Sequence, residues 1–120
     1  MCSSDLKENV VLEKSFNFSI KIIKLYTFLK EHNEYVISKQ LLRSGTSIGA
    51  NAEEADAGQT HKDFTAKMSI ASKEARETRY WLRLLQKSQL VKHDYKEYLD
   101  DVEEIVRILT AIVKTSQQGK

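Results

Sequence analysis

Apolar residues recur at helical spacing along nearly the whole chain. They lie three and four residues apart, which is the period of an amphipathic helix and not the alternation of a half-buried strand. Segments with this pattern cover approximately residues 9–31, 34–57, 61–89 and 95–115. The connections between them are short, so the pattern predicts an all-α protein, an antiparallel up-down-up-down four-helix bundle that forms a single domain over residues 1–120.

Polar residues and a glycine mark the expected helix ends. Asn33 should cap the second helix, Thr60 the third and Asp94 the fourth, because short polar side chains accept hydrogen bonds from the free N–H groups of a first turn. Gly58 should end the second helix in the left-handed conformation that glycine adopts easily.

The first segment is apolar on more than one side. Its inner stripe contains Val11, Ser15, Phe18, Ile22, Leu25 and Leu29. The stripe is widened by Phe16, Ile20, Ile23, Tyr26 and Phe28. A helix with such a broad apolar surface usually buries more than one face.

The second segment has helical periodicity but fills its inner stripe with small and polar residues. Ser44 and Asn51 lie where apolar residues normally face other helices, so each needs a hydrogen-bond partner. Gly45, Gly49 and Ala52 form an offset row. Glycine inside a helix costs roughly 1 kcal/mol relative to alanine, so we expect another helix to approach this row closely.

We expect a hydrogen-bonded polar network between the second and third helices. Such a network would fix one register among similar helices. Its predicted members are Arg43, Ser44, Ser47, Asn51, Glu54, Glu74 and Glu77.

Apolar residues of the third segment exceed what the core of four helices needs, and surplus apolar surface indicates a partner. Combined with the glycine row, this predicts association of the bundle with copies of itself or with another protein, of which self-association is commoner. The predicted oligomer interface contains Gly45, Gly49, Ala52, Trp81 and Leu84.

The charge distribution singles out the third helix as a basic element. The net charge is only +2, but residues 59–91 hold seven Lys and Arg against three Asp and Glu. At about 100° per residue, most of these cations fall within an arc of roughly 120° that also contains an aromatic residue. Arginines interleaved with an aromatic can hold phosphates and stack on bases. The candidate nucleic-acid-binding residues are Lys62, Lys73, Arg76, Arg79, Tyr80, Arg83 and Lys87. The alternative is a solvated helix face whose cations pair locally with Glu74 and Glu77.

The sequence contains no pattern typical of an enzyme or a metalloprotein. A di-metal bundle needs Glu-x-x-His pairs, which are absent, and His32, His61 and His93 fall at expected helix ends or loops. There is no glycine-rich phosphate loop and no Cys-His pair. We therefore expect no catalytic residue, no metal and no cofactor. A hydrolytic site between subunits that uses Glu54, Glu74 or Glu77 is the weakest alternative.

Composition also bears on the compartment. The chain has no proline, and its single cysteine, Cys2, excludes an internal disulfide. No run is long and apolar enough to span a membrane. We expect a cytoplasmic protein without a membrane partner.

A resemblance to a known family rests on the run QLLRSGTSIGANAEEADAGQTHKDF and on KMSIASKEARETRYWLRLL after it. These resemble the four-helix-bundle family of bacterial 23S rRNA intervening-sequence proteins. The resemblance implies an antiparallel bundle that assembles into a homopentameric ring. One branch of the family serves diversity-generating retroelements, where it binds a reverse transcriptase and nucleic acid through a basic surface. This chain departs from the commonest pattern, Asn-Ile-Ala-Glu-Gly, by reading Asn51-Ala52-Glu53-Glu54-Ala55.

Two main hypotheses follow. The first is a non-enzymatic, self-assembling scaffold that binds RNA, DNA or a nucleic-acid enzyme such as a reverse transcriptase through the basic face of the third helix. The second is an adaptor that docks a helix of another protein on its apolar flank, without nucleic acid.

Overall fold

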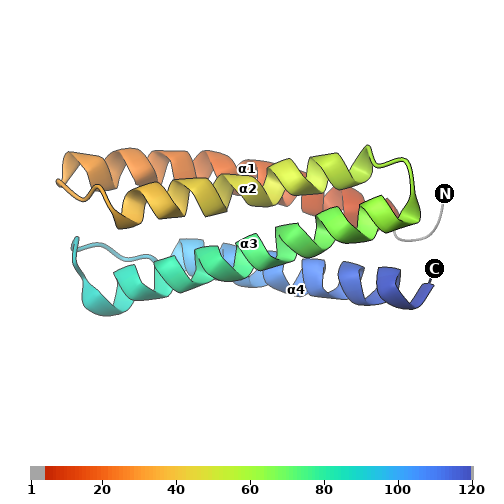
Figure 1. Ribbon diagram of the computed structural model, residues 1–120. Helices are drawn as coiled ribbons and strands as arrows, with labels where there is room; N and C mark the ends of the chain where they lie inside the picture. The colour runs from red at the N-terminus through yellow and green to blue at the C-terminus, as the bar shows by residue number, and fades with distance from the viewer. Residues whose placement is uncertain (1–4, 120) are drawn as a thin grey trace.

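The computed structural model describes the backbone of residues 5–119 and the side chains of residues 9–119. The described part folds into four helices without strands: α1 (Asp5–Glu31), α2 (Ile37–Asp56), α3 (His61–Ser88) and α4 (Lys96–Gly119). α1 contacts α2 and α4, and α3 contacts the same two helices, so the helices enclose one shared core (Figure 1). The bundle is elongated, with extents of 46 × 20 × 18 Å.

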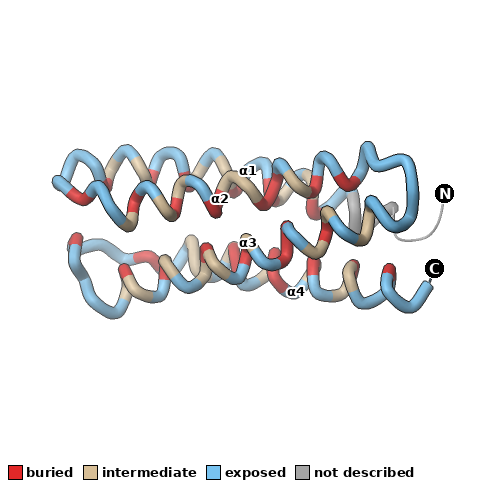
Figure 2. Tube along the Cα trace, in the orientation of Figure 1, coloured by how far each residue is buried: buried red, intermediate tan, exposed pale blue. Residues whose placement is uncertain are grey.

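The core is built from the inner stripe of each helix, and buried positions recur along all four helices (Figure 2). The stripes interlock because apolar side chains three and four residues apart lie on one side of each helix. The largest fully buried side chains include Phe18, Ile22, Leu41, Leu82, Tyr95 and Leu109. Within the described helices, none is long and apolar enough to cross a membrane.

Tyr95 is the one tyrosine in this fully buried set, and it precedes α4. Its hydroxyl donates a 2.8 Å hydrogen bond to the Val91 carbonyl, which satisfies the polar end of the ring. Burial, followed by the charge of Glu34, raises the pKa of Tyr95 to about 12.

The α1–α2 connection corrects the expectation for Asn33. This residue has φ 65° and ends α1, where its N–H bonds to the Lys30 carbonyl and the Glu34 N–H bonds to the Leu29 carbonyl. This is a Schellman motif, in which asparagine occupies the left-handed position that glycine often fills. The cap of α2 comes instead from Glu34, whose carboxylate accepts from the N–H groups of Val36, Ile37 and Ser38 at 3.1, 2.9 and 2.6 Å.

The expectation for Gly58 is also wrong. No glycine in the described part has a positive φ, and the C-cap residue Ala57 is right-handed at φ −89°. The Gly58 N–H bonds to the Ala55 carbonyl at 3.0 Å, so the end of the helix tightens rather than reverses hand. The expected cap of α3 is confirmed, because the Thr60 hydroxyl accepts from the Asp63 N–H at 3.0 Å. Asp94 likewise accepts from the Lys96 N–H at the start of α4.

Candidate functional site

Charged residues join α2 and α3 at the surface of the bundle. Arg43 of α2 reaches across to Glu74 at 3.3 Å and also pairs with Glu77. The Glu77 carboxylate accepts a second hydrogen bond, from the Trp81 indole N–H at 3.1 Å. Four side chains from two helices thus form one cluster. Three of them were predicted members of the polar network, and Trp81 is the fourth.

The other predicted network residues do not join this cluster. Ser44 is buried and lies 2.8 Å from the Thr78 hydroxyl, a partner that was not among the predicted network residues. Asn51 bonds to the Ser47 carbonyl one turn away on its own helix. The predicted network therefore separates into the Arg43 cluster and smaller contacts, because each side chain meets the nearest group with which it can bond. Thr78 could have been included, since it occupies an inner heptad position opposite α2.

The glycine row corrects the predicted oligomer interface. Gly45, Gly49 and Ala52 are buried inside the chain. A Cβ on Gly45 would lie 2.9 Å from the Ile22 methyl carbon Cγ2, and a Cβ on Gly49 would lie 3.4 Å from the Ser15 hydroxyl. Because α1 covers the row, the row is not available to a second copy of the chain. The other two predicted interface residues, Trp81 and Leu84, are half-buried.

Two of the candidate nucleic-acid-binding arginines turn toward α4. Arg76 donates to the Thr110 hydroxyl at 2.9 Å, and Arg79 pairs with Glu103 at 2.9 Å. A long arginine side chain at the edge of one helix can reach the adjacent helix. Angular positions calculated from the sequence do not reveal this. These two cations are therefore partly engaged within the bundle.

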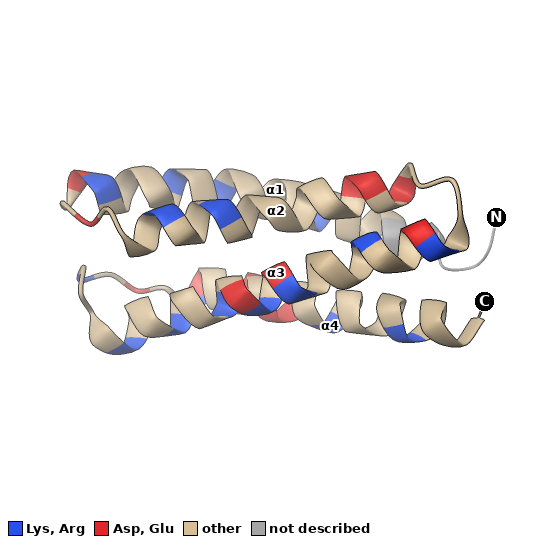
Figure 3. Ribbon diagram, in the orientation of Figure 1, with Lys and Arg blue, Asp and Glu red and all other residues tan. Residues whose placement is uncertain are grey.

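The remaining candidates face outward. Tyr80 is 53% exposed, and its ring packs edge-on against Trp81 with a centroid separation of 5.4 Å. The four remaining cations lie on the same side of α3, with Lys62 at the opposite end of the helix from Tyr80. They are exposed and have no ion-pair partner within residues 9–119. We call this surface the Tyr80 face, and it comprises Lys62, Lys73, Tyr80, Arg83 and Lys87. Basic positions recur along α3 in Figure 3, interrupted by acidic ones.

The carboxylates proposed for a hydrolytic site all sit beside cations. Glu54 pairs with Lys67 at 2.7 Å, and both Glu74 and Glu77 pair with Arg43. Within the part of the chain that the structure describes, no cluster of His, Cys, Asp and Glu side chains could hold a metal ion.

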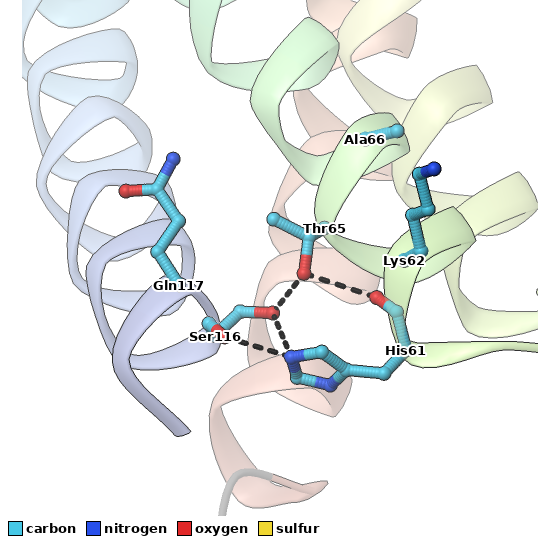
Figure 4. Close-up of a pocket in the computed structure, with 6 residues that line it drawn as sticks. All are labelled: His61, Lys62, Thr65, Ala66, Ser116 and Gln117. Atoms are coloured by element: carbon cyan, nitrogen blue, oxygen red, sulfur yellow. Dashed lines mark hydrogen bonds between the residues drawn. The ribbon is translucent and has the colours of Figure 1, made fainter. Parts of the chain in front are cut away.

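A shallow pocket at the start of α3 brings a histidine and a serine together (Figure 4). His61 Nε2 lies 2.7 Å from the Ser116 carbonyl oxygen and 3.4 Å from the Ser116 hydroxyl. A carbonyl only accepts, so Nε2 carries a hydrogen and cannot remove the proton of the serine. The pair therefore joins α3 to α4 and lacks the arrangement of a nucleophile with its base.

Comparisons with known proteins agree with this architecture. The sequence profile of a family described as 23S rRNA-intervening sequence protein matches residues 7–111. A similar crystal structure comes from Bacteroides thetaiotaomicron, of a protein of unknown function in the S23 ribosomal protein family. It has 49% sequence identity and a TM-score of 0.85, and the match covers 91% of this chain and 99% of that chain. A comparison with curated proteins finds no match.

Proposed function

Because the chain belongs to the 23S rRNA-intervening sequence protein family, we propose that it is a non-enzymatic, self-assembling helical bundle that binds RNA through the Tyr80 face. The observation that carries this proposal is the exposure of Tyr80 among cations that have no ion-pair partner in the described part of the chain. Cations not neutralised within the fold are free to replace the counterions of a phosphate backbone.

The chemistry of the Tyr80 face suits unpaired nucleotides best. Arg83 and Lys87 lie within two turns of Tyr80 on α3, so phosphates and one base could be bound together. Stacking on an exposed aromatic ring is available to bases of loops and single strands, but not to bases inside an A-form helix. The preferred ligand is therefore an RNA loop or single-stranded segment.

The antiparallel up-down-up-down order and the homopentameric ring belong to the same proposal. The order is supported by the contacts of each helix with its chain neighbours and by two connections at one end of the bundle and one at the other (Figure 1). A ring would present several Tyr80 faces to one RNA, which raises the overall affinity without new contacts. We place the protein in the cytoplasm, where such an RNA would be met.

Docking of a protein helix is less well supported. Trp81, a residue of the predicted interface, is half-buried and already donates to Glu77. The glycine row of the predicted interface is covered by α1. A protein partner such as a reverse transcriptase remains an outcome of the experiment below.

The experiment measures binding of a fluorescent RNA hairpin with an unpaired loop over a series of salt concentrations. Replacing Arg83 and Lys87 together by Glu should weaken binding at least tenfold and reduce the salt slope by about 1.4, since a single strand contributes about 0.7 per phosphate contact. Tyr80→Ala should weaken binding roughly tenfold with little change in slope.

The matched control replaces Lys39 and Lys114 by Glu, because both lysines are exposed and lie on other helices. It alters the net charge equally and should retain most of the affinity. Equal loss in both double variants would mean that only net charge matters, and the Tyr80 face would then not be the site. Absence of RNA binding, together with nuclease-resistant capture of one protein, would favour the adaptor.

A further inference from the structure

The carboxylate of Glu77 has one oxygen that the fold holds and one that it leaves free. Glu77 Oε2 accepts from the Arg43 guanidinium and, at 3.1 Å, from the Trp81 indole N–H. Glu77 Oε1 has no hydrogen-bond partner among the side chains and backbone groups of residues 9–119. The side chain is 36% exposed, so a ligand at the surface can reach this second oxygen.

Glu77 adjoins the exposed ring of Tyr80. The two residues are three apart on α3, so their Cβ atoms lie about 5–6 Å from each other. Trp81 contacts both of them. Its indole N–H donates to Glu77, and its ring packs edge-on against Tyr80 with 5.4 Å between the ring centroids. A surface for stacking and a free hydrogen-bond acceptor are therefore held next to each other.

Opposite charges flank Tyr80 on the two sides of α3. At about 100° per residue, Arg83 and Lys87 are turned from Tyr80 toward α4, whereas Glu77 is turned toward α2. Phosphates are attracted by the two cations and repelled by the carboxylate. A strand whose phosphates follow Arg83 and Lys87 would therefore lay a base over Tyr80 with its outer edge toward Glu77.

The free oxygen of Glu77 distinguishes bases by their hydrogen-bonding groups. A carboxylate oxygen accepts hydrogen bonds but cannot donate them. Cytosine, adenine and guanine each carry an exocyclic amine that can donate to it, and glutamate commonly accepts from the N4 amine of cytosine. Uracil carries carbonyl oxygens and no exocyclic amine, and its one edge N–H lies between two carbonyls that a carboxylate repels. Amino-bearing bases are therefore favoured over uracil at this position.

The charge around Glu77 favours the same bases. Arg43 is the one cation that pairs with Glu74 and Glu77 among the described side chains, so the three groups together keep one negative charge. Both carboxylates are partly buried, which strengthens their electrostatic interactions relative to water. The hydrogens of an exocyclic amine carry partial positive charge, whereas a carbonyl oxygen carries partial negative charge.

We propose that the RNA base stacked on Tyr80 is selected by its exocyclic amine, with Glu77 Oε1 as the acceptor. Arg43 and Trp81 are positioning residues, because their bonds to Oε2 fix the carboxylate and leave Oε1 to the base. The ligand is an unpaired RNA segment with cytosine, adenine or guanine at this position. Uracil at the same position is disfavoured.

This inference rests on the proposed function, since it requires an RNA bound at the Tyr80 face, but the two are separated by what is measured. The proposed function concerns the affinity for RNA and its dependence on salt. The inference concerns the ratio of affinities for two RNAs that differ in one chemical group. A protein that binds RNA without base preference would refute the inference and leave the proposed function intact, whereas absence of RNA binding would refute both.

The first experiment compares two fluorescent RNA hairpins that share one stem and carry a loop of cytidines or a loop of uridines. The two bases have rings of the same size, so they differ chiefly in their edge groups. The full chain should bind the cytidine loop about tenfold more tightly, which corresponds to about 1.4 kcal/mol. Equal affinities, or tighter binding of the uridine loop, would overturn the proposal.

Glu77→Gln tests the acceptor itself. The amide oxygen of glutamine can still accept from Arg43 and Trp81, which leaves an NH₂ group in place of the free carboxylate oxygen. This group donates to the O4 carbonyl of uracil, so the preference should reverse toward the uridine loop. A Glu77→Gln protein that keeps the full preference for cytidine would refute the role of this carboxylate.

The matched control is Glu74→Gln, which removes the same charge from the same cluster about one turn earlier on α3. Glu74 is six residues from Tyr80, so its side chain is farther from the stacked base. Both loops should bind this variant slightly more tightly, with the ratio of the two affinities unchanged. An equal change of the ratio in both variants would mean that negative charge alone decides, and would contradict a hydrogen bond to Glu77.

Guanosine and inosine isolate the amine from the rest of the base, because inosine lacks only the N2 amine of guanosine. One residue of the uridine loop is replaced by either nucleoside. The unaltered protein should bind the guanosine loop several times more tightly, and Glu77→Gln should remove most of this difference. Equal binding of the two loops by the unaltered protein would overturn selection by the exocyclic amine.

Trp81→Phe tests the positioning of the carboxylate. Phenylalanine keeps an aromatic ring beside Tyr80 but removes the N–H that donates to Glu77 Oε2. The preference for cytidine should decrease, because Arg43 alone then orients the carboxylate. An unchanged preference would show that Trp81 has no positioning role. Circular dichroism establishes that every variant keeps the helical content of the unaltered protein.

Discussion

α1 packs against its two neighbours in opposite ways. Against α2 the contact is made by small residues, with Gly45 beneath Ile22 and Gly49 beside Ser15. Against α4 the contact is edged by lysines. Lys14 pairs with Glu104 at 3.3 Å, and Lys21 pairs with both Glu97 and Asp101 at 2.5 Å. We refer to these contacts as the glycine seam and the lysine seam.

The difference shows how one helix can use two kinds of stabilisation. The glycine seam depends on close packing of atoms, which is indifferent to salt but intolerant of added volume. The lysine seam depends on charges at the surface, which are screened by salt and tolerate changes of shape. Burial lowers the pKa of Lys21, but the hydrogen bonds and charges of Asp101 and Glu97 outweigh it and leave the pKa above its usual value.

The largest effect is expected for Gly45→Ala. The new methyl group would lie 2.9 Å from Cγ2 of Ile22, which is buried and cannot move freely. The overpacking should exceed the gain in helix propensity and lower the free energy of unfolding by about 1 to 2 kcal/mol, measured by urea denaturation. Ile22→Val should restore part of this loss in the double variant. A Gly45→Ala protein at least as stable as the unaltered one would mean that the seam is looser than described.

Gly49→Ala should act in the opposite direction. Its added Cβ would meet Ser15 at 3.4 Å, an ordinary contact distance. The gain in helix propensity should then dominate and raise the free energy of unfolding by up to about 1 kcal/mol. The same urea titration compares the two glycines directly. Destabilisation by both substitutions would show that the whole row, and not Gly45 alone, is too tight for a methyl group.

Lys21→Met should weaken the lysine seam by about 0.5 to 1 kcal/mol, because partly exposed ion pairs contribute little each. The salt dependence of stability should decrease in this variant, since the pairs that salt screens are gone. Gly45→Ala is the matched control and should keep the salt dependence of the unaltered protein. An identical response to salt in all three proteins would remove the electrostatic interpretation of the seam.

Alkaline pH should weaken the lysine seam but not the glycine seam, because only the lysine seam contains groups that titrate. Lys21 has a folded pKa above its unfolded value of 10.5, so its contribution to stability is complete below that pH and is lost as the pH rises through the folded pKa. The raised pKa of Tyr95 affects stability in the same direction. Its contribution to the free energy of unfolding is complete below the unfolded pKa of about 10 and is lost as the pH rises through about 12.

The measurement is the thermal midpoint between pH 9 and pH 12. Lys21→Met and Tyr95→Phe should each flatten part of the alkaline decline, whereas Gly49→Ala should shift the whole curve without changing its shape. The phenolate absorbance of the protein should lose its latest-titrating component in Tyr95→Phe. Curves of the same shape in all variants would indicate that neither group titrates in the folded protein at these pH values.

Helical content and the core could be predicted from the sequence, because a stripe of apolar residues at helical spacing has few ways to be buried. The cap at Thr60 follows from local chemistry in the same way. Asn33 and Gly58 could not be assigned by residue type alone. A Schellman turn accommodates asparagine as well as glycine, and the carboxylate of Glu34 supplied the cap of α2 from outside the expected position.

The candidate site was only partly predictable. The arc of cations on α3 was visible in the sequence, but not that Arg76 and Arg79 bend toward α4 while Arg83 and Lys87 do not. The pairing of Arg43 with two glutamates of α3 also needed the relative placement of two helices. Long side chains choose among partners that only the packed bundle brings within reach.

The sequence by itself determined that four helices form, which side of each is buried, and that the chain resembles a known family. The tertiary structure decided which helix covers the glycine row and which apolar surface is left outside. The physical reason is that periodicity fixes directions around one helix axis, whereas contacts depend on where the other axes lie. The row at Gly45 and Gly49 was filled by α1, and the outer side of α1 remained open.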